Sequence, residues 1–149
     1  MSRVESSIII NADVDKVFNL AKDIEQFPQF MEDLKSVKIL EQSPDGCHVV
    51  SEFVGIVKEF KTTMKWVEDD KWDPQAKTCK FDLVKGDFKT YTGLWTFEPV
   101  DGGTKYTSVI EFEYDIPMIG PLIKNLIAKK MKQNVDNMLL AIKEKAEQG

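Results

Sequence analysis

The sequence predicts an α+β protein in which a curved, seven-stranded antiparallel sheet wraps around one long C-terminal helix. Three observations support this fold class. The chain has 149 residues, the size of a single domain, which we expect to cover 1–149. Seven segments with strand-like patterns are separated mostly by short turns. The segment from Leu122 to Ile142 carries one apolar stripe at helical spacing.

The N-terminal region predicts a strand followed by one or two short helices. Residues 4–10 are rich in β-branched side chains, which favour a strand. Asp13 is a candidate N-cap residue, because Val17 and Phe18 begin an apolar pattern at helical spacing after it. A second short helix over 25–30 is compatible with Pro28, since proline fits the first turn of a helix.

From residue 34 onward the pattern changes to strands joined by turns, which predicts an antiparallel meander. Asp101-Gly102-Gly103 is typical of a hairpin turn. An irregular loop containing Pro74 is expected over 69–75. The predicted strands of the meander cover 36–42, 48–57, 59–67, 77–85, 87–99 and 104–116.

The C-terminal segment predicts an amphipathic helix that runs to about Lys145. Some 25 residues at ~1.5 Å per residue form a rod of about 37 Å. A sheet with one apolar face needs a cover, and this helix is the only predicted element large enough to provide it. Because a seven-stranded sheet twists and curls, it cannot contact the rod everywhere. A wedge-shaped space is therefore expected between them.

One face of the strand 87–99 carries large aromatic side chains around Gly93. A glycine weakens a strand unless something approaches its backbone closely or the sheet bends there, and the sequence leaves both explanations open. The inward faces are mostly apolar with a few hydroxyls, which suits an amphipathic or aromatic ligand; a filled core is the alternative. The expected cavity residues are Phe53, Phe60, Met64, Trp66, Phe81, Tyr91, Gly93, Trp95, Tyr106, Ser108, Ile110, Phe112, Leu122, Leu126, Met131, Val135 and Met138.

Charged side chains are expected mainly on the surface. The acidic residues Glu68, Asp69, Asp70 and Asp73 are predicted to be solvated. His48 is the only histidine and follows a turn, so we expect it at the rim of the sheet. These assignments leave the inward faces without a histidine, an arginine or a carboxylate.

The chain offers few candidates for catalysis. No metal or other cofactor is expected, because the sequence has no metal-ligand spacing and no phosphate-binding glycine loop. If the protein is an enzyme, Tyr91 and Tyr106 are the candidate catalytic residues. A phenol with its ordinary pKa of about 10 is a modest acid at neutral pH. The residues therefore favour binding over catalysis.

Three segments in a fixed order resemble one known superfamily. They are FPQFMEDLKSVKIL (27–40), LVKGDFKTYTGLWTFEPVDGGTKY (83–106) and FEYDIPMIGPLI (112–123). Together they resemble the START-like, helix-grip superfamily, and within it the coenzyme Q-binding and polyketide cyclase/dehydrase branch. The resemblance covers essentially the whole chain and implies the fold described above. Members bind sterols, lipids, quinones or polyketides, and some are cyclases or ribosome-directed factors, so the resemblance implies no single ligand.

We therefore expect the protein to bind a hydrophobic small molecule, such as a lipid, a quinone or a polyketide, between the sheet and the helix. Transport or chaperoning of that molecule is compatible with this function. Two alternatives stay open: a polyketide cyclase/aromatase-type enzyme, and a ribosome- or membrane-associated accessory protein. The sequence does not identify the ligand or the oligomeric state.

Location and partners follow from the apolar runs and the charges. The absence of an apolar run of about 18 residues and of a signal-peptide core predicts a cytoplasmic protein. A net charge of −5 argues against nucleic acid as a partner. Lys124, Lys129 and Lys130 adjoin an apolar segment that suits weak contact with an anionic membrane. That segment is the predicted ligand entrance: Pro117, Met118, Ile119 and Gly120.

Overall fold

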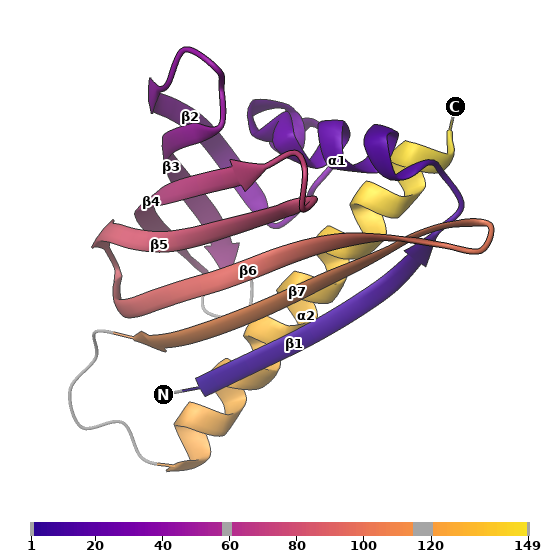
Figure 1. The fold of residues 1–149 in the computed structure, drawn as a ribbon. Helices are drawn as coiled ribbons and strands as arrows, with labels where there is room; N and C mark the ends of the chain where they lie inside the picture. Colours follow the sequence, from indigo (N-terminus) through magenta and orange to yellow (C-terminus); the bar gives the residue numbers. More distant parts are fainter. Residues whose placement is uncertain (1, 58–60, 115–120, 149) are drawn as a thin grey trace.

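The computed structural model describes residues 2–57, 61–114 and 121–148, with the backbone alone described at 57, 121 and 123. Its strands form one seven-stranded sheet in the order β1-β7-β6-β5-β4-β3-β2, shown in Figure 1. All neighbouring strands are antiparallel, which confirms the sequence prediction. The strands are β1 (Ser2–Ile10), β2 (Leu34–Gln42), β3 (His48–Val57), β4 (Thr62–Asp73), β5 (Thr78–Gly86), β6 (Phe88–Val100) and β7 (Gly103–Tyr114).

Two short helices carry the chain from one edge of the sheet to the other. β1 pairs with β7 at one edge, whereas β2 forms the opposite edge. α1 (Val14–Lys22) and the 3-10 helix η1 (Ile24–Gln29) make the crossing between them. Asp13 caps α1 as predicted, because its Oδ2 accepts a hydrogen bond from the Asp15 backbone N–H at 3.1 Å.

α1 closes one end of the space inside the sheet. Its apolar face buries Val17, Phe18 and Ala21. The Phe18 ring makes edge-on contacts with Trp72 and Phe97, each with ring centroids 5.5 Å apart. This end of the molecule is therefore a filled aromatic core.

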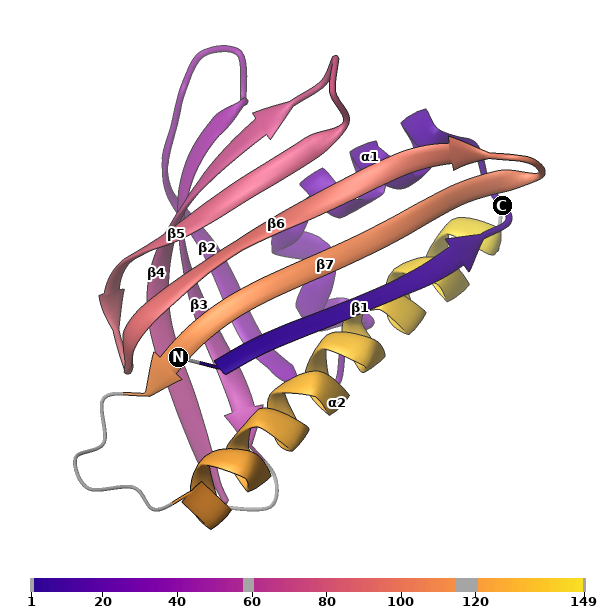
Figure 2. The same ribbon diagram turned by 60° about the horizontal axis from the view of Figure 1, so that its bottom comes forward.

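α2 (Pro121–Glu147) is the predicted long helix and crosses the open side of the bent sheet beside β1, as Figures 1 and 2 show. Its C-terminal half provides the contact, since Val135, Leu139 and Ile142 are buried. Polar bonds add to this packing, because the Lys143 ammonium donates to the Ile9 carbonyl at 3.0 Å. The sheet therefore grips the second half of the helix.

The first half of α2 differs from the sequence prediction. Leu122 and Leu126, expected to face the cavity, have exposed fractions of 83% and 45%. Figure 1 shows the physical reason, because the first turns of α2 project beyond the N-terminal end of β1. The apolar stripe continues along the helix past the end of the surface that could cover it.

β4 is longer than predicted. The sequence placed a loop over 69–75, but β4 stays paired with β5 up to Asp73, opposite Thr78. The turn follows immediately, and the Asp73 carboxylate accepts the backbone N–H groups of Gln75 and Ala76, both at 3.0 Å. Acidic residues on both faces of the strand hid the alternation that would have revealed its continuation.

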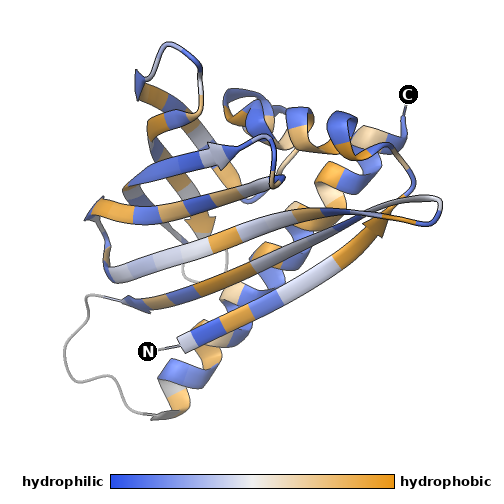
Figure 3. Ribbon diagram, viewed as in Figure 1, coloured by the Kyte–Doolittle hydropathy of each residue, from blue (hydrophilic) through white to orange (hydrophobic). Residues whose placement is uncertain are grey.

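The described chain has the mixed hydropathy expected of this architecture. Figure 3 shows hydrophobic and hydrophilic residues interleaved along the strands and along α2. Within the described ranges, no helix is both long and apolar enough to span a membrane.

Candidate ligand-binding site

A cavity of about 350 Å³ lies between the sheet and α2. Its volume falls in the range of ~300–1,000 Å³ that is usual for small-molecule sites. β2 to β7 supply the wall on the sheet side, while α2, η1 and the connection between η1 and β2 supply the remainder. The predicted cavity residues found in this lining are Phe53, Met64, Trp66, Phe81, Tyr91, Trp95, Ser108, Ile110, Met131, Val135 and Met138.

Gly93 does not line the cavity, and the structure explains why a glycine stands there. A Cβ atom at this position would lie 2.3 Å from the Cζ atom of Phe81 and 2.8 Å from the Val109 carbonyl oxygen. The close approach is therefore made by a side chain of the neighbouring strand. Phe81, which does line the cavity, lies directly over the glycine.

Tyr106 and Phe112 belong to the packed core and are absent from the cavity wall. Tyr106 is fully buried and stacks on Phe97 with ring centroids 4.6 Å apart. Phe112 is 1% exposed and packs edge-on against Tyr114. Alternation gave their inward direction correctly, but it could not show which inward side chains are covered by other side chains and which border the cavity. Tyr106 is consequently a poor candidate for contact with a ligand.

The remaining predicted positions are not assigned to the site. Leu122 and Leu126 are exposed on the first half of α2. Phe60 and the predicted entrance, 117–120, lie outside the described residues.

Two buried carboxyl groups in the cavity wall are the main correction to the sequence analysis. Glu68 is 6% exposed and Asp70 is 2% exposed, and both line the cavity. They occupy alternate positions of β4, so they share its inward face. The other two acids of the predicted surface group are not buried. Asp73 is exposed, and Asp69 takes an outward position, where it contacts the exposed His48 at 2.7 Å. The inner surface therefore does contain carboxyl groups.

Glu68 is held in place by an aromatic cluster. The Trp66 indole N–H donates a hydrogen bond to Glu68 Oε1 at 2.8 Å. The indole ring is fixed in turn by stacking on Phe53, with centroids 5.4 Å apart and planes inclined by 7°. This arrangement keeps the carboxyl group directed along the wall of the cavity.

Burial favours the protonated forms of both acids. It raises the pKa of Glu68, although hydrogen bonds from Asp70 and Trp66 oppose this effect. Burial also raises the pKa of Asp70 well above its usual range, and the adjacent Glu68 charge adds to the rise. Two carboxyl groups this close cannot easily ionise together. Asp70 therefore holds its proton more strongly, and Glu68 is the first of the pair to become a carboxylate.

Polar atoms without partners gather on the same part of the sheet. Within the described part of the chain, Asp70 Oδ1, Trp72 Nε1 and Ser51 Oγ are buried and make no hydrogen bond. Trp72 and Asp70 both line the cavity. A buried polar group without a partner costs about 1–3 kcal/mol. The Asp70 and Trp72 atoms, which belong to the lining, are therefore available to a polar group of a bound molecule.

The phenols and the thiol of the wall stay protonated at neutral pH. Burial raises the pKa of Tyr91 well above its usual range and that of Tyr114 to about 12. Burial also raises the pKa of the Cys79 thiol, with the charges of Asp70 and Glu68 contributing. The phenols can donate hydrogen bonds, whereas the Glu68–Asp70 pair offers the two carboxyl groups of the wall whose pKa values burial raises. Sequence analysis missed this pair because it stopped the strand at residue 67.

The exposed part of the lining marks an opening of the cavity. Glu32, from the connection between η1 and β2, and Asn137, Leu140 and Glu144, from α2, line the cavity and are exposed. The Asn137 side-chain amide donates a hydrogen bond to Asp33 Oδ2 at 3.1 Å, which joins these two segments. This opening lies beside the C-terminal half of α2.

A metal site is not assigned to the cavity. Among the described residues, no three His, Cys, Asp or Glu side chains are grouped in a way that could hold a metal ion. The arrangement instead combines apolar walls, two carboxyl groups and a few unpaired donors and acceptors.

Sequence comparisons connect the chain to named proteins. A family model described as polyketide cyclase/dehydrase and lipid transport matches residues 10–139. The ribosome association toxin RatA of Vibrio cholerae serotype O1 is 28% identical over 153 residues, which cover 99% of this chain and 97% of the relative. RatA of Escherichia coli K12 is 23% identical over 150 residues, covering 99% of this chain and 89% of the relative.

Structural comparisons agree with the family match. TTHA0849 from Thermus thermophilus has a TM-score of 0.90 at 28% identity, with 97% of each chain covered. The Zhui aromatase/cyclase from Streptomyces sp. R1128 has a TM-score of 0.87 at 16% identity, covering 98% of this chain and 93% of that chain. A START superfamily protein from Mycobacterium smegmatis has a TM-score of 0.82 at 18% identity, covering 98% and 97%. The last two likenesses concern the fold alone. With its family model spanning residues 10–139 and its helix-grip architecture, the chain belongs to the START-like polyketide cyclase/dehydrase and lipid transport family.

Proposed function

We propose that the protein binds a hydrophobic small molecule in the cavity between the sheet and α2. The observation that carries this proposal is the volume of about 350 Å³ enclosed mainly by aromatic, methionine and aliphatic side chains. Apolar area removed from water contributes roughly 25 cal/mol per Å², so such walls favour an apolar ligand. A lipid, a quinone or a polyketide would fit this description.

N-phenyl-1-naphthylamine, an uncharged compound that fluoresces in apolar surroundings, tests the proposal. We expect saturable binding to the wild-type protein. Met138→Trp should abolish it, because Met138 lines the cavity and the larger side chain fills the space. Leu94→Trp is the matched control, since Leu94 is 40% exposed and lies outside the lining. Equal binding by both variants would show that the compound binds elsewhere.

A cyclase-type reaction remains an alternative, and the structure changes its candidate residues. The sequence analysis named Tyr91 and Tyr106, but Tyr106 is buried in the core. Glu68 and Asp70 replace it as candidates, because two carboxyl groups with different proton affinities can act as base and acid. Product formation from a linear polyketide that disappears in Glu68→Gln would favour this alternative over binding alone.

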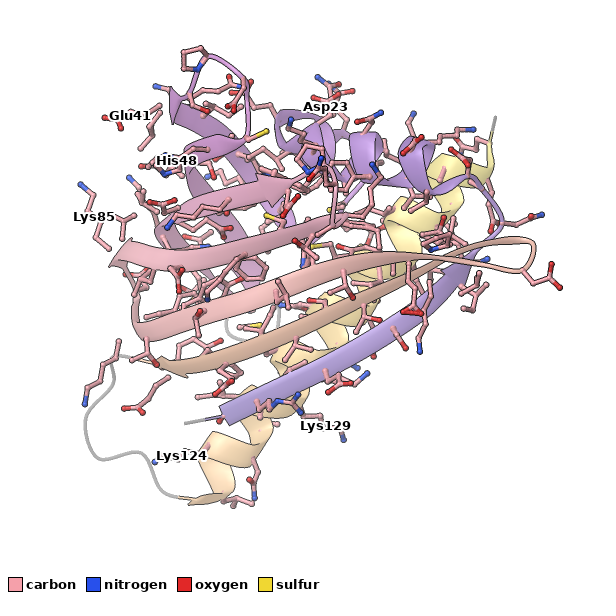
Figure 4. All side chains as sticks on the ribbon, viewed as in Figure 1. Asp23, Glu41, His48, Lys85, Lys124 and Lys129 are labelled. Carbon is pink, nitrogen blue, oxygen red and sulfur yellow. The ribbon has the colours of Figure 1, made fainter. Side chains whose placement is uncertain are left out.

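Ribosome association is a second candidate function. It is supported by the names of the RatA relatives, whose similarity spans 99% of this chain. The first half of α2 offers a surface for such a contact, since Leu122, Leu126, Lys124 and Lys129 are exposed there. Figure 4 shows Lys124 and Lys129 on this half of the helix, far from His48.

Sedimentation through a sucrose gradient tests the second candidate. Wild-type protein should travel with ribosomal particles, and a Lys124→Glu/Lys129→Glu variant should remain at the top. A Lys16→Glu/Lys105→Glu variant, which changes two exposed lysines outside α2, is the matched control. Binding of the wild type to anionic vesicles, without ribosome binding, would instead favour the membrane contact expected from the sequence.

A further inference from the structure

The ionisable side chains that line the described cavity wall include acids but no basic residue. Among the described lining residues there are five carboxyl side chains and no lysine, arginine or histidine. Two of these acids, Glu68 and Asp70, lie inside the cavity wall, and the other three, Glu32, Asp33 and Glu144, lie in the segments that form the opening. Lys145 is not part of the lining, although its ammonium lies 5.9 Å from the centre of the ring of Phe30, which is.

A carboxylate or phosphate group entering this cavity would lose its hydration without meeting a cation. Transfer of an unpaired charge into an apolar interior is strongly unfavourable. An anion would also oppose ionisation of Glu68, because the low-dielectric walls strengthen the repulsion between like charges. An anionic amphiphile is therefore poorly matched to the site.

A polar group that donates hydrogen bonds is well matched to the same wall. Glu68 already accepts one hydrogen bond from Trp66, and a carboxylate has capacity for several more. Asp70 Oδ1, which belongs to a residue only 2% exposed, has no partner among the described residues and can also accept. An ammonium group would favour the carboxylate form of Glu68, the first of the pair to lose its proton, and would then add attraction between opposite charges to these bonds.

We propose that the cavity selects hydrophobic molecules whose polar end is a cationic or uncharged hydrogen-bond donor, such as an amine or a hydroxyl group, and rejects molecules that end in a carboxylate or a phosphate. This inference rests on the proposed function and narrows its ligand class. Free fatty acids and polyketide acids are thereby excluded, whereas hydrophobic amines and alcohols are favoured.

Three compounds test this selection, because they share a naphthalene ring and differ in the charge of their polar group. They are 2-naphthylmethylamine, 2-naphthalenemethanol and 2-naphthoate. Each is used at neutral pH to displace N-phenyl-1-naphthylamine from the protein, and native mass spectrometry detects each complex directly. We expect the amine to bind most tightly, the alcohol next and the carboxylate at least about tenfold more weakly than the amine, a difference of about 1.4 kcal/mol. A carboxylate that binds as well as the amine overturns the inference while leaving the proposed function intact.

Glu68→Gln tests the residue that we place at the centre of this selection. Glutamine keeps an oxygen for the Trp66 N–H, so the wall retains its hydrogen bond while losing the charge. In this variant we expect the affinities for the amine and for the carboxylate to become nearly equal, whereas the affinity for the alcohol should stay unchanged. Glu111→Gln, at an exposed position outside the lining, removes the same charge from the outer surface and should change nothing. Equal effects of the two variants would contradict selection within the cavity.

Glu144→Gln provides a second variant if Glu68→Gln fails to fold, because Glu144 is exposed at the opening. We expect Glu144→Gln to reduce the preference for the amine over the carboxylate, by less than Glu68→Gln is expected to. A preference equal to that of wild type would oppose the inference. If neither the fluorescent compound nor any of the three naphthyl compounds binds the wild type, the proposed function itself fails together with this inference.

Discussion

The ring of Phe81 lies across the backbone of Gly93 on the neighbouring strand, so close that a Cβ atom at residue 93 would stand 2.3 Å from its Cζ atom. The two residues are directly opposite in the β5–β6 register. Phe81 cannot easily move aside, because Tyr91 and Trp95 pack against it with ring centroids 5.7 Å away. The glycine thus lets a large aromatic side chain form part of the cavity wall.

Gly93→Ala should therefore destabilise the protein. Overpacking of this kind costs roughly 1–3 kcal/mol, which urea unfolding would measure. The same substitution should cost much less in a Phe81→Leu background, where the ring is gone. Equal costs in the two backgrounds would show that the strain arises from the Val109 carbonyl oxygen, 2.8 Å from the same Cβ position.

The stability should carry a pH dependence from the buried acids of β4. Burial raises the pKa of Asp70 and of Glu68, so the folded state keeps protons that the unfolded chain releases at ordinary carboxyl pKa values of about 4. Their contribution to stability is complete below that pH and decreases as the pH rises through the folded-state pKa values.

Asp70→Asn should remove part of this dependence, since asparagine does not ionise. The free energy of unfolding of the variant, relative to wild type, should increase as the pH is raised above about 4, because only the wild type loses stability as Asp70 ionises. Urea unfolding across a pH series measures the difference. Glu111→Gln, at an exposed outer position, is the control and should run parallel to wild type. If the free energy of unfolding of Asp70→Asn also ran parallel to that of wild type across the pH series, the pKa of Asp70 would not be raised in the folded state.

Trp66→Phe should weaken the support of Glu68. The variant removes the donor of the 2.8 Å hydrogen bond, and a bond to a charged acceptor contributes about 1.5–3 kcal/mol. The pKa of Glu68 should rise further, which carbon NMR of its carboxyl group can measure. Trp72→Phe is a matched control, because the Trp72 indole N–H has no partner among the described residues. A Glu68 pKa that is the same in both variants would contradict this role.

Asn137→Ala should alter how fast a ligand enters. Its amide bonds to Asp33 across the opening of the cavity, and removal of an exposed contact should change stability by no more than about 0.5 kcal/mol. We expect faster association and dissociation of N-phenyl-1-naphthylamine in stopped-flow fluorescence. Gln133→Ala, also exposed on α2, serves as the control. Unchanged rates in Asn137→Ala would locate the entrance elsewhere.

Most of the fold was predictable because its signals are local. Period-two alternation predicted the strands, and Asp13 indicated where α1 begins. The apolar stripe from Leu122 to Ile142 predicted α2. The resemblance to the START-like superfamily led to the same architecture. These features depend on residues close together in the chain, so they could be identified without the tertiary structure.

The depth of the cavity and its acids were not predictable in the same way. Tyr106 and Trp95 both point inward, but α1 fills the space over only one of them, which depends on a contact between distant segments. Glu68 and Asp70 looked like surface residues because carboxyl groups are rarely buried without compensation. The clue was present in Trp72, which continues the alternation of Trp66 beyond the acids and marks them as part of a strand.

Native mass spectrometry of the protein, purified from the cells that naturally make it, tests the central claim most directly. We expect a fraction of the wild-type protein to carry an added mass that organic solvent extracts and that is an uncharged or cationic hydrophobic molecule. Met138→Trp, prepared in the same way, should carry none, and Leu94→Trp should carry the wild-type amount. A wild-type protein with only the mass of its chain, which also fails to bind N-phenyl-1-naphthylamine, would contradict a ligand-binding cavity.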